Sequence, residues 1–171
     1  MKDFNLLGAC GLYCGACTHY RATFPEHKHL LDKAKDQGYI IEGYTCQGCR
    51  SEILYIHKGC DECTIRACVE KRELLHCGEC KEMPCDKLVS FKKDGHIHHL
   101  DIYSNLAEIE QIGSENWLVE QKERWKCKCG FPYSWYEKNC MNCSEEVNSY
   151  ESRKKHVQKE DQQSEVKKIR P

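Results

Sequence analysis

The polar and apolar positions that follow the helical period most clearly lie in the second half of the chain. Residues 105–112 predict one helix, for which Ser104 is a good N-cap and Gly113 a stop. Its apolar face consists of Leu106, Ile109 and Ile112. Ser114 is placed to cap a second helix, along which the spacing continues through Trp117, Leu118, Gln121 and Trp125. We therefore expect two helices at an angle, with their tryptophans packed in the core.

Shorter helices are predicted nearer the N-terminus. Residues 27–37 read as a helix that starts after Pro25 and is stopped by Gly38. Two further helical stretches begin at Cys68 and Cys85, and each follows a C-x2-C-x4-C motif. The two motifs are seventeen residues apart, so the sequence predicts a metal-binding turn followed by a helical turn, used twice.

The composition provides a thin supply of side chains for a hydrophobic core. Hydrophobic residues make up 40% of the 171 residues, and this count includes 15 cysteines, whereas 31% are charged. Small domains with thin cores are commonly stabilised by disulfides or metals. The net charge of −1, from 26 Lys+Arg and 27 Asp+Glu, gives no general basis for binding nucleic acid. No stretch approaches the roughly 20 apolar residues of a membrane span.

The use of cysteine favours metal binding over disulfides. Residues 1–5 carry an acid and no apolar run of the length that a signal peptide needs, so we expect a cytoplasmic location, where thiols stay reduced. Most cysteines lie in C-x2-C or C-x-C pairs, which let two thiolates from one turn bind one ion. The candidate ligands are Cys10, Cys14, Cys17, Cys46, Cys49, Cys60, Cys63, Cys68, Cys77, Cys80, Cys85, Cys127, Cys129, Cys140 and Cys143.

The last four cysteines are the most self-contained motif, C-x-C-x10-C-x2-C. Four thiolates complete a tetrahedral structural zinc site. The aromatic segment between the two pairs, residues 131–136, suits a hairpin, so we expect a zinc ribbon. The first pair departs from the usual C-x2-C spacing, and four-thiolate iron is the main alternative.

The eleven N-terminal cysteines do not divide by four, so one histidine would complete three tetrahedral sites. His19, His57 and His76 each lie within three residues of a cysteine. One plausible single site is formed by Cys46, Cys49, Cys60 and Cys63. Another group, the hook of Cys10, Cys14 and Cys17, needs a fourth ligand from elsewhere.

Two other classes of protein compete with a structural zinc protein. An iron–sulfur protein for redox or electron transfer also uses closely spaced cysteines, and residues 10–85 could hold a cluster. An enzyme with an incompletely ligated metal at the hook is the second alternative. The histidines of residues 95–99 could form a labile metal site, although we expect a solvated turn there.

Several motifs together are specific enough to indicate relatives. They are Cys10-Gly11-Leu12-Tyr13-Cys14-Gly15-Ala16-Cys17, Cys46-Gln47-Gly48-Cys49, Cys63 to Cys68, Cys77-Gly78-Glu79-Cys80 and Pro84-Cys85. In these residues the chain resembles a cysteine-rich prokaryotic family, domain of unknown function 3795. The resemblance implies a small cytoplasmic protein, zinc-binding through these cysteines, with no established activity.

We thus predict a small α-rich (α+β) fold stabilised by two to four zinc ions. Residues 1–93 would form a cysteine-rich domain of metal turns and helices, 94–126 a helical segment, 127–150 a zinc-ribbon hairpin, and 151–171 a disordered polar tail. Closed metal sites favour a protein-interaction module over an enzyme. The sequence names no partner and indicates no membrane.

Overall fold

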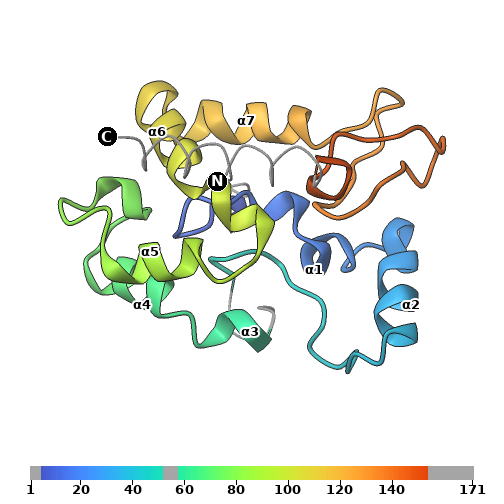
Figure 1. The fold of residues 1–171 in the computed structure, drawn as a ribbon, viewed down its shortest axis with the longest axis horizontal. Coiled ribbons are helices and arrows are strands. Elements are labelled where there is room, and N and C mark those ends of the chain that lie inside the picture. Colours follow the sequence, from blue (N-terminus) through green and yellow to red (C-terminus); the bar gives the residue numbers. More distant parts are fainter. Residues whose placement is uncertain (1–4, 52–57, 154–171) are drawn as a thin grey trace, which may run out of the picture.

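The computed structural model describes residues 5–51 and 58–153, which form short helices joined by long irregular loops (Figure 1). The α-helices are α1 (Thr18–Arg21), α2 (Lys28–Asp36), α3 (Lys58–Asp61), α4 (Thr64–Lys71), α5 (Asp86–Lys92), α6 (Ile102–Ile112) and α7 (Ser114–Arg124). The 3-10 helices are η2 (Cys14–Ala16), η3 (Pro25–His27), η5 (Cys77–Glu79) and η6 (Ile97–Asp101). None of the described helices has the length and apolar composition needed to cross a bilayer.

Helices α6 and α7 supply much of the core, as the apolar spacing predicts. Trp117 and Trp125 are 0% and 1% exposed. Gly113 separates the two helices with a φ of 81°, a conformation that suits glycine. The expected N-cap is wrong, because α6 begins at Ile102 and the Ser104 hydroxyl donates to the Asp101 carbonyl inside the first turn.

The shorter helices also follow the predictions, with one shift. Helix α2 ends before Gly38, and α5 begins directly after Cys85. Helix α4 starts four residues before Cys68, so this cysteine lies inside the helix rather than at its start. The two repeats differ because Pro84 lacks a backbone N–H and disfavours helix in the residue before it, which delays α5.

The predicted zinc-ribbon hairpin is wrong. The described residues contain isolated β-bridges but no strand, and two of these bridges, Lys126 with Pro132 and Asn139 with Glu146, each close one cysteine turn. The segment between the turns binds other parts of the chain instead of a partner strand. The Tyr133 N–H donates to the Trp125 carbonyl, and the Trp135 N–H donates to the Ala16 carbonyl over 2.9 Å. Both backbone groups of Trp135 are therefore already used, since its carbonyl also accepts a hydrogen bond from the Tyr150 N–H.

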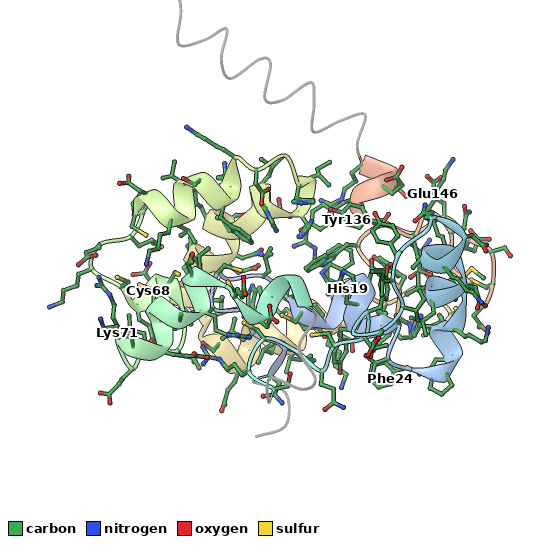
Figure 2. The ribbon with its side chains drawn as sticks, turned by 90° about the horizontal axis from the view of Figure 1, so that it is seen from below. His19, Phe24, Cys68, Lys71, Tyr136 and Glu146 are labelled. Atoms are coloured by element: carbon green, nitrogen blue, oxygen red, sulfur yellow. The ribbon has the colours of Figure 1, made fainter. Side chains whose placement is uncertain are left out.

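The expected solvated turn at residues 95–99 is wrong for two of its histidines. His99 is 6% exposed, and its Nδ1 lies 2.8 Å from Asp94 Oδ1. The His98 ring stacks on Trp135 with centroids 4.2 Å apart. The His98 contact joins η6 to the C-terminal segment, whose Tyr136 (labelled in Figure 2) interacts electrostatically with Cys17, the residue before α1.

One hydrophobic core spans the first three of the four predicted segments. Its buried members run from Leu7 through Leu88 and Trp117 to Tyr150. The boundaries predicted at residues 93, 126 and 150 stay predictions. Most of the predicted polar tail lies outside the described residues; its first three residues are helical.

Candidate metal centres

The four cysteines of the C-terminal unit form a compact group. Their Sγ atoms all lie within 4.8 Å of one another. The Sγ atoms of Cys127 and Cys143 are 3.6 Å apart, and those of Cys129 and Cys140 are also 3.6 Å apart. Four sulfurs bound to one zinc ion at about 2.3 Å would lie about 3.8 Å from each other. The spacing therefore fits one tetrahedral metal ion with four thiolate ligands.

A tight turn presents the first pair of these thiols. The Cys127 N–H donates to the Phe131 carbonyl, and the Gly130 N–H donates back to the Cys127 carbonyl, both over 2.8 Å. Gly130 has a φ of 87°, which a residue without Cβ adopts freely. The chain therefore reverses directly after Cys129 and brings both sulfurs to one side.

The second pair is presented by a turn of the same kind. The Cys140 N–H donates to the Glu145 carbonyl, and the Ser144 N–H donates to the Cys140 carbonyl, both over 2.8 Å. Ser144 has a φ of 63° and takes the place that Gly130 has in the first turn. The C-x-C and C-x2-C arms thus form comparable turns despite their different spacing.

The thiols of this group differ in their surroundings. Cys127 and Cys140 are buried, whereas Cys129 and Cys143 are exposed. Hydrogen bonds from the Phe131 backbone and the Asn142 side chain lower the pKa of Cys129 to about 6, while burial raises the pKa of Cys140. Asn142 Nδ2 lies 3.6 Å from the Cys129 sulfur. The pKa of Cys129 is therefore held below those of Cys140 and Cys143.

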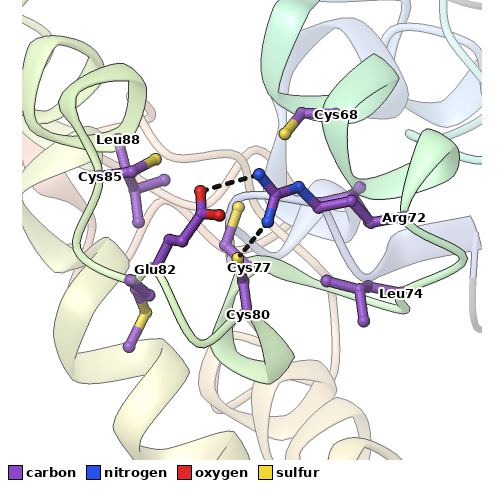
Figure 3. Close-up of a pocket in the computed structure, with 10 residues that line it drawn as sticks. Cys68, Arg72, Leu74, Cys77, Cys80, Glu82, Cys85 and Leu88 are labelled. Atoms are coloured by element: carbon purple, nitrogen blue, oxygen red, sulfur yellow. Dashed lines mark hydrogen bonds and ion pairs between the residues drawn. The ribbon is translucent and has the colours of Figure 1, made fainter.

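A second group of cysteines surrounds a small cavity between α4 and α5 (Figure 3). Its four members are Cys68, Cys77, Cys80 and Cys85. The cavity has a volume of about 30 Å³, which is far too small for a typical organic substrate. Apolar side chains line its remaining wall, among them Val69, Leu74, Met83 and Leu88. Burial and the neighbouring thiols raise the pKa of Cys77 to about 12.

Arg72 is a charged side chain at this cavity that the sequence did not single out. Its guanidinium lies 3.5 Å from the Cys80 sulfur and 2.8 Å from a Glu82 carboxylate oxygen (Figure 3). Arg72 therefore places a positive charge beside the Cys80 sulfur. The sequence signal for Arg72 was its position four residues after Cys68, one turn further along the same helix face.

The other seven N-terminal cysteines are neighbours of one another and fall into two groups. Cys14 hydrogen bonds to Cys49, which lowers the pKa of the Cys49 thiol to about 6. Burial raises the pKa of Cys10 well above its usual value, and Cys49, Cys63 and Cys77 raise it further. The structure thus places two thiols of the hook beside Cys49.

The third thiol of the hook, Cys17, has Cys46 rather than Cys49 as its neighbour. Burial raises the pKa of Cys17 to about 11, and Cys46 adds to this effect. Burial also raises the pKa of Cys60 to about 12, with Cys17 and Cys46 as its strongest thiol neighbours. Cys46 and Cys49, expected together in one site, therefore have different closest neighbours.

The three candidate histidine ligands have different surroundings. His57 lies outside the described residues. The Nδ1 of His19 lies 2.8 Å from the Tyr44 carbonyl. His76 accepts a hydrogen bond from the Gly78 N–H at Nδ1, and its Nε2 lies 3.5 Å from the Ser114 hydroxyl. His76 thus has a partner at each ring nitrogen and joins η5 to the start of α7.

The fold and its thiol groups define a helix-rich, cysteine-rich protein with clusters that could bind metal. Residues 6–90 match the sequence model of a family described as "Protein of unknown function (DUF3795)". The chain therefore resembles that family over its N-terminal half, as the motifs predict, and the C-terminal unit lies outside the match. Searches of curated proteins and of solved structures gave no match.

Proposed function

We propose that this protein binds zinc at the four C-terminal cysteines and uses the ion to hold its fold together. The observation that carries the proposal is the 3.6 Å separation within each sulfur pair of the group. Four protein ligands leave no open position for a substrate, so the role of this ion is structural. The seven N-terminal thiols around the hook would hold further zinc ions, for a total of two to four.

Elemental analysis of the full chain tests the zinc assignment. Cys140→Ser removes a buried ligand, so we expect the variant to lose about one zinc per chain relative to wild type. Met141→Ser is the matched control, because Met141 is 55% exposed between two ligands and supplies none. Equal zinc content in wild type and Cys140→Ser would contradict the proposal.

An iron–sulfur cluster at Cys68, Cys77, Cys80 and Cys85 is a second candidate function. Four cysteines surround one apolar cavity, and they do not form a compact group like the C-terminal one among the described residues. Four cysteine thiolates are the ligand set that iron–sulfur clusters use. Arg72 beside the Cys80 sulfur would add a hydrogen bond of the kind that tunes cluster potentials.

Anaerobic purification distinguishes the two metals at this cavity. A cluster predicts a brown protein that contains iron and acid-labile sulfide, and Cys77→Ser should remove the colour while Cys140→Ser keeps it. A colourless protein that contains only zinc would exclude the cluster.

We further propose that the metal-stabilised surface serves as a platform for a protein partner. The support is the closed geometry of the C-terminal group, together with the exposed Met141 at the tip of its second turn. Affinity purification with wild type and with Met141→Glu tests it. A partner that is recovered equally with both proteins would exclude this surface.

A further inference from the structure

Two histidines and one acid from distant parts of the sequence meet where α2 lies near the C-terminal unit (Figure 1). His27 is the last residue of η3, and His29 lies in the first turn of α2. Glu137 is 108 residues further along the chain than His29. One ligand atom from each residue lies within 4.8 Å of the other two. This group shares no residue with the cysteine groups.

His27 is the most informative member, because its polar atoms have no partner. The residue is 0% exposed, and neither ring nitrogen has a hydrogen-bond partner within residues 5–51 and 58–153. Buried polar atoms are nearly always paired, since unpaired ones lose their interactions with water. Burial and the neighbouring Arg21 also lower the pKa of His27, which keeps the imidazole in the neutral form.

Glu137 is held in position by the backbone. Its Oε2 accepts a hydrogen bond from the Ser134 N–H over 2.5 Å, and its Oε1 lies 2.7 Å from His29 Nε2. Hydrogen bonds of this kind orient the carboxylates that bind metals. The side chains of Glu137 and His29 are 9% and 25% exposed, so the group opens to solvent on the His29 side.

We propose that His27, His29 and Glu137 bind a divalent transition-metal ion of the zinc class. Two imidazoles and one carboxylate are a ligand set that proteins use for zinc, with a fourth position left for water. The same set with further open positions binds ferrous iron. The bound ion supplies a partner for one of the two unpaired His27 nitrogens and joins α2 to the C-terminal unit.

The competing interpretation is a simple ion pair between His29 and Glu137, with His27 as a passive core residue. That interpretation leaves both buried nitrogen atoms of His27 unpaired, whereas a bound ion pairs one of them. It also predicts no uptake of metal beyond the thiolate sites, which makes the two interpretations separable by experiment.

Titration with Co²⁺ tests the proposal on the full chain after its thiolate sites have been loaded with zinc and zinc bound elsewhere has been removed with a weak chelator. We expect wild type to take up about one further Co²⁺ per chain, with weak visible bands and without the intense near-ultraviolet sulfur charge transfer of a thiolate site. His27→Phe and Glu137→Gln should each lose this ion and keep the zinc content of wild type.

The matched control is His99→Gln, which removes another buried histidine that pairs with a carboxylate. It should bind Co²⁺ as wild type does. Far-ultraviolet circular dichroism checks the fold of each variant, and if His27→Phe does not fold, Glu137→Gln and His29→Gln decide. Absence of the additional Co²⁺ in wild type, or equal uptake by the folded variants, would overturn the proposal.

Discussion

At the scale of single residues, backbone conformation shapes the two turns that carry the four C-terminal cysteines. Gly130 and Ser144 both have positive φ, at corresponding places in the two cysteine turns. Positive φ costs most residues about 1–2 kcal/mol because Cβ approaches the carbonyl oxygen. The turns therefore depend on the identity of one residue each.

We predict that Gly130→Val weakens metal binding at the proposed C-terminal site and lowers the free energy of unfolding by about 1–2 kcal/mol. The cause is conformational, because no atom lies within 4 Å of the Cβ that would be added. Competition with a chelator measures the affinity, and denaturant unfolding measures the stability. Gly38→Val, also at positive φ with open space, is the control and should lower stability while zinc affinity stays unchanged.

At the scale of elements, α6 and α7 pack together through large side chains that face the N-terminal segment. Trp117 lies edge-on to Tyr13 with ring centroids 6.2 Å apart, and its indole N–H donates to Glu108 over 2.8 Å. On another face of α7, Val119 is 64% exposed. Helix α7 thus contains Trp117, which is essential for packing, and Val119, which is not.

We expect Trp117→Ala to lower the free energy of unfolding by about 3–5 kcal/mol, because it leaves a large cavity between the two helices and Tyr13. Val119→Ala should change it by less than about 0.5 kcal/mol. Equilibrium denaturation of the metal-loaded proteins measures both values. A loss below about 1 kcal/mol for the tryptophan variant would contradict this packing.

The burial of His98 in η6 predicts that the stability of the fold decreases in acid. Burial lowers the pKa of His98 far below its usual value, so the folded state holds this imidazole neutral while the unfolded state takes up a proton below about pH 6.5. Stability that is present above pH 6.5 is therefore lost as the pH falls below it.

We predict that His98→Gln flattens this pH dependence between pH 7.5 and 5.5. Unfolding free energies of wild type and variant across that range provide the measurement, and the difference between the two curves removes the shared effect of the metal sites. Parallel curves would show that His98 does not titrate on unfolding.

At the scale of the whole molecule, one core joins the family-like N-terminal half to the rest of the chain. Gly11, in the N-terminal half, would meet Leu106 of α6 at 2.7 Å if it carried a Cβ, and its carbonyl accepts a hydrogen bond from Asn105. Tyr150, near the C-terminal end of the described residues, donates a hydrogen bond to Asp101 over 2.8 Å. These contacts make the stability of each part depend on the others.

We predict that a fragment of residues 1–93 does not fold cooperatively, even with zinc, because it exposes the apolar side chains that pack on α6 and α7. A fragment of residues 1–153 should retain a cooperative transition. Thermal unfolding followed by circular dichroism compares the two. A sharp transition for the short fragment would show that the N-terminal half has a sufficient core of its own.

The sequence by itself determined what depends on neighbours along the chain: the helical faces, the buried tryptophans and the grouping of the four C-terminal cysteines, whose thiols come from two short turns. Only the tertiary structure decided how the N-terminal thiols divide, because the hook sends Cys14 toward Cys49 and Cys17 toward Cys46. It also replaced the expected hairpin, since the Trp135 N–H donates to the carbonyl of distant Ala16. The His-x-His pattern at His27 was visible in the sequence, but its carboxylate partner is not. Spacing fixes which side chains share a turn, whereas packing of distant segments fixes which turns meet.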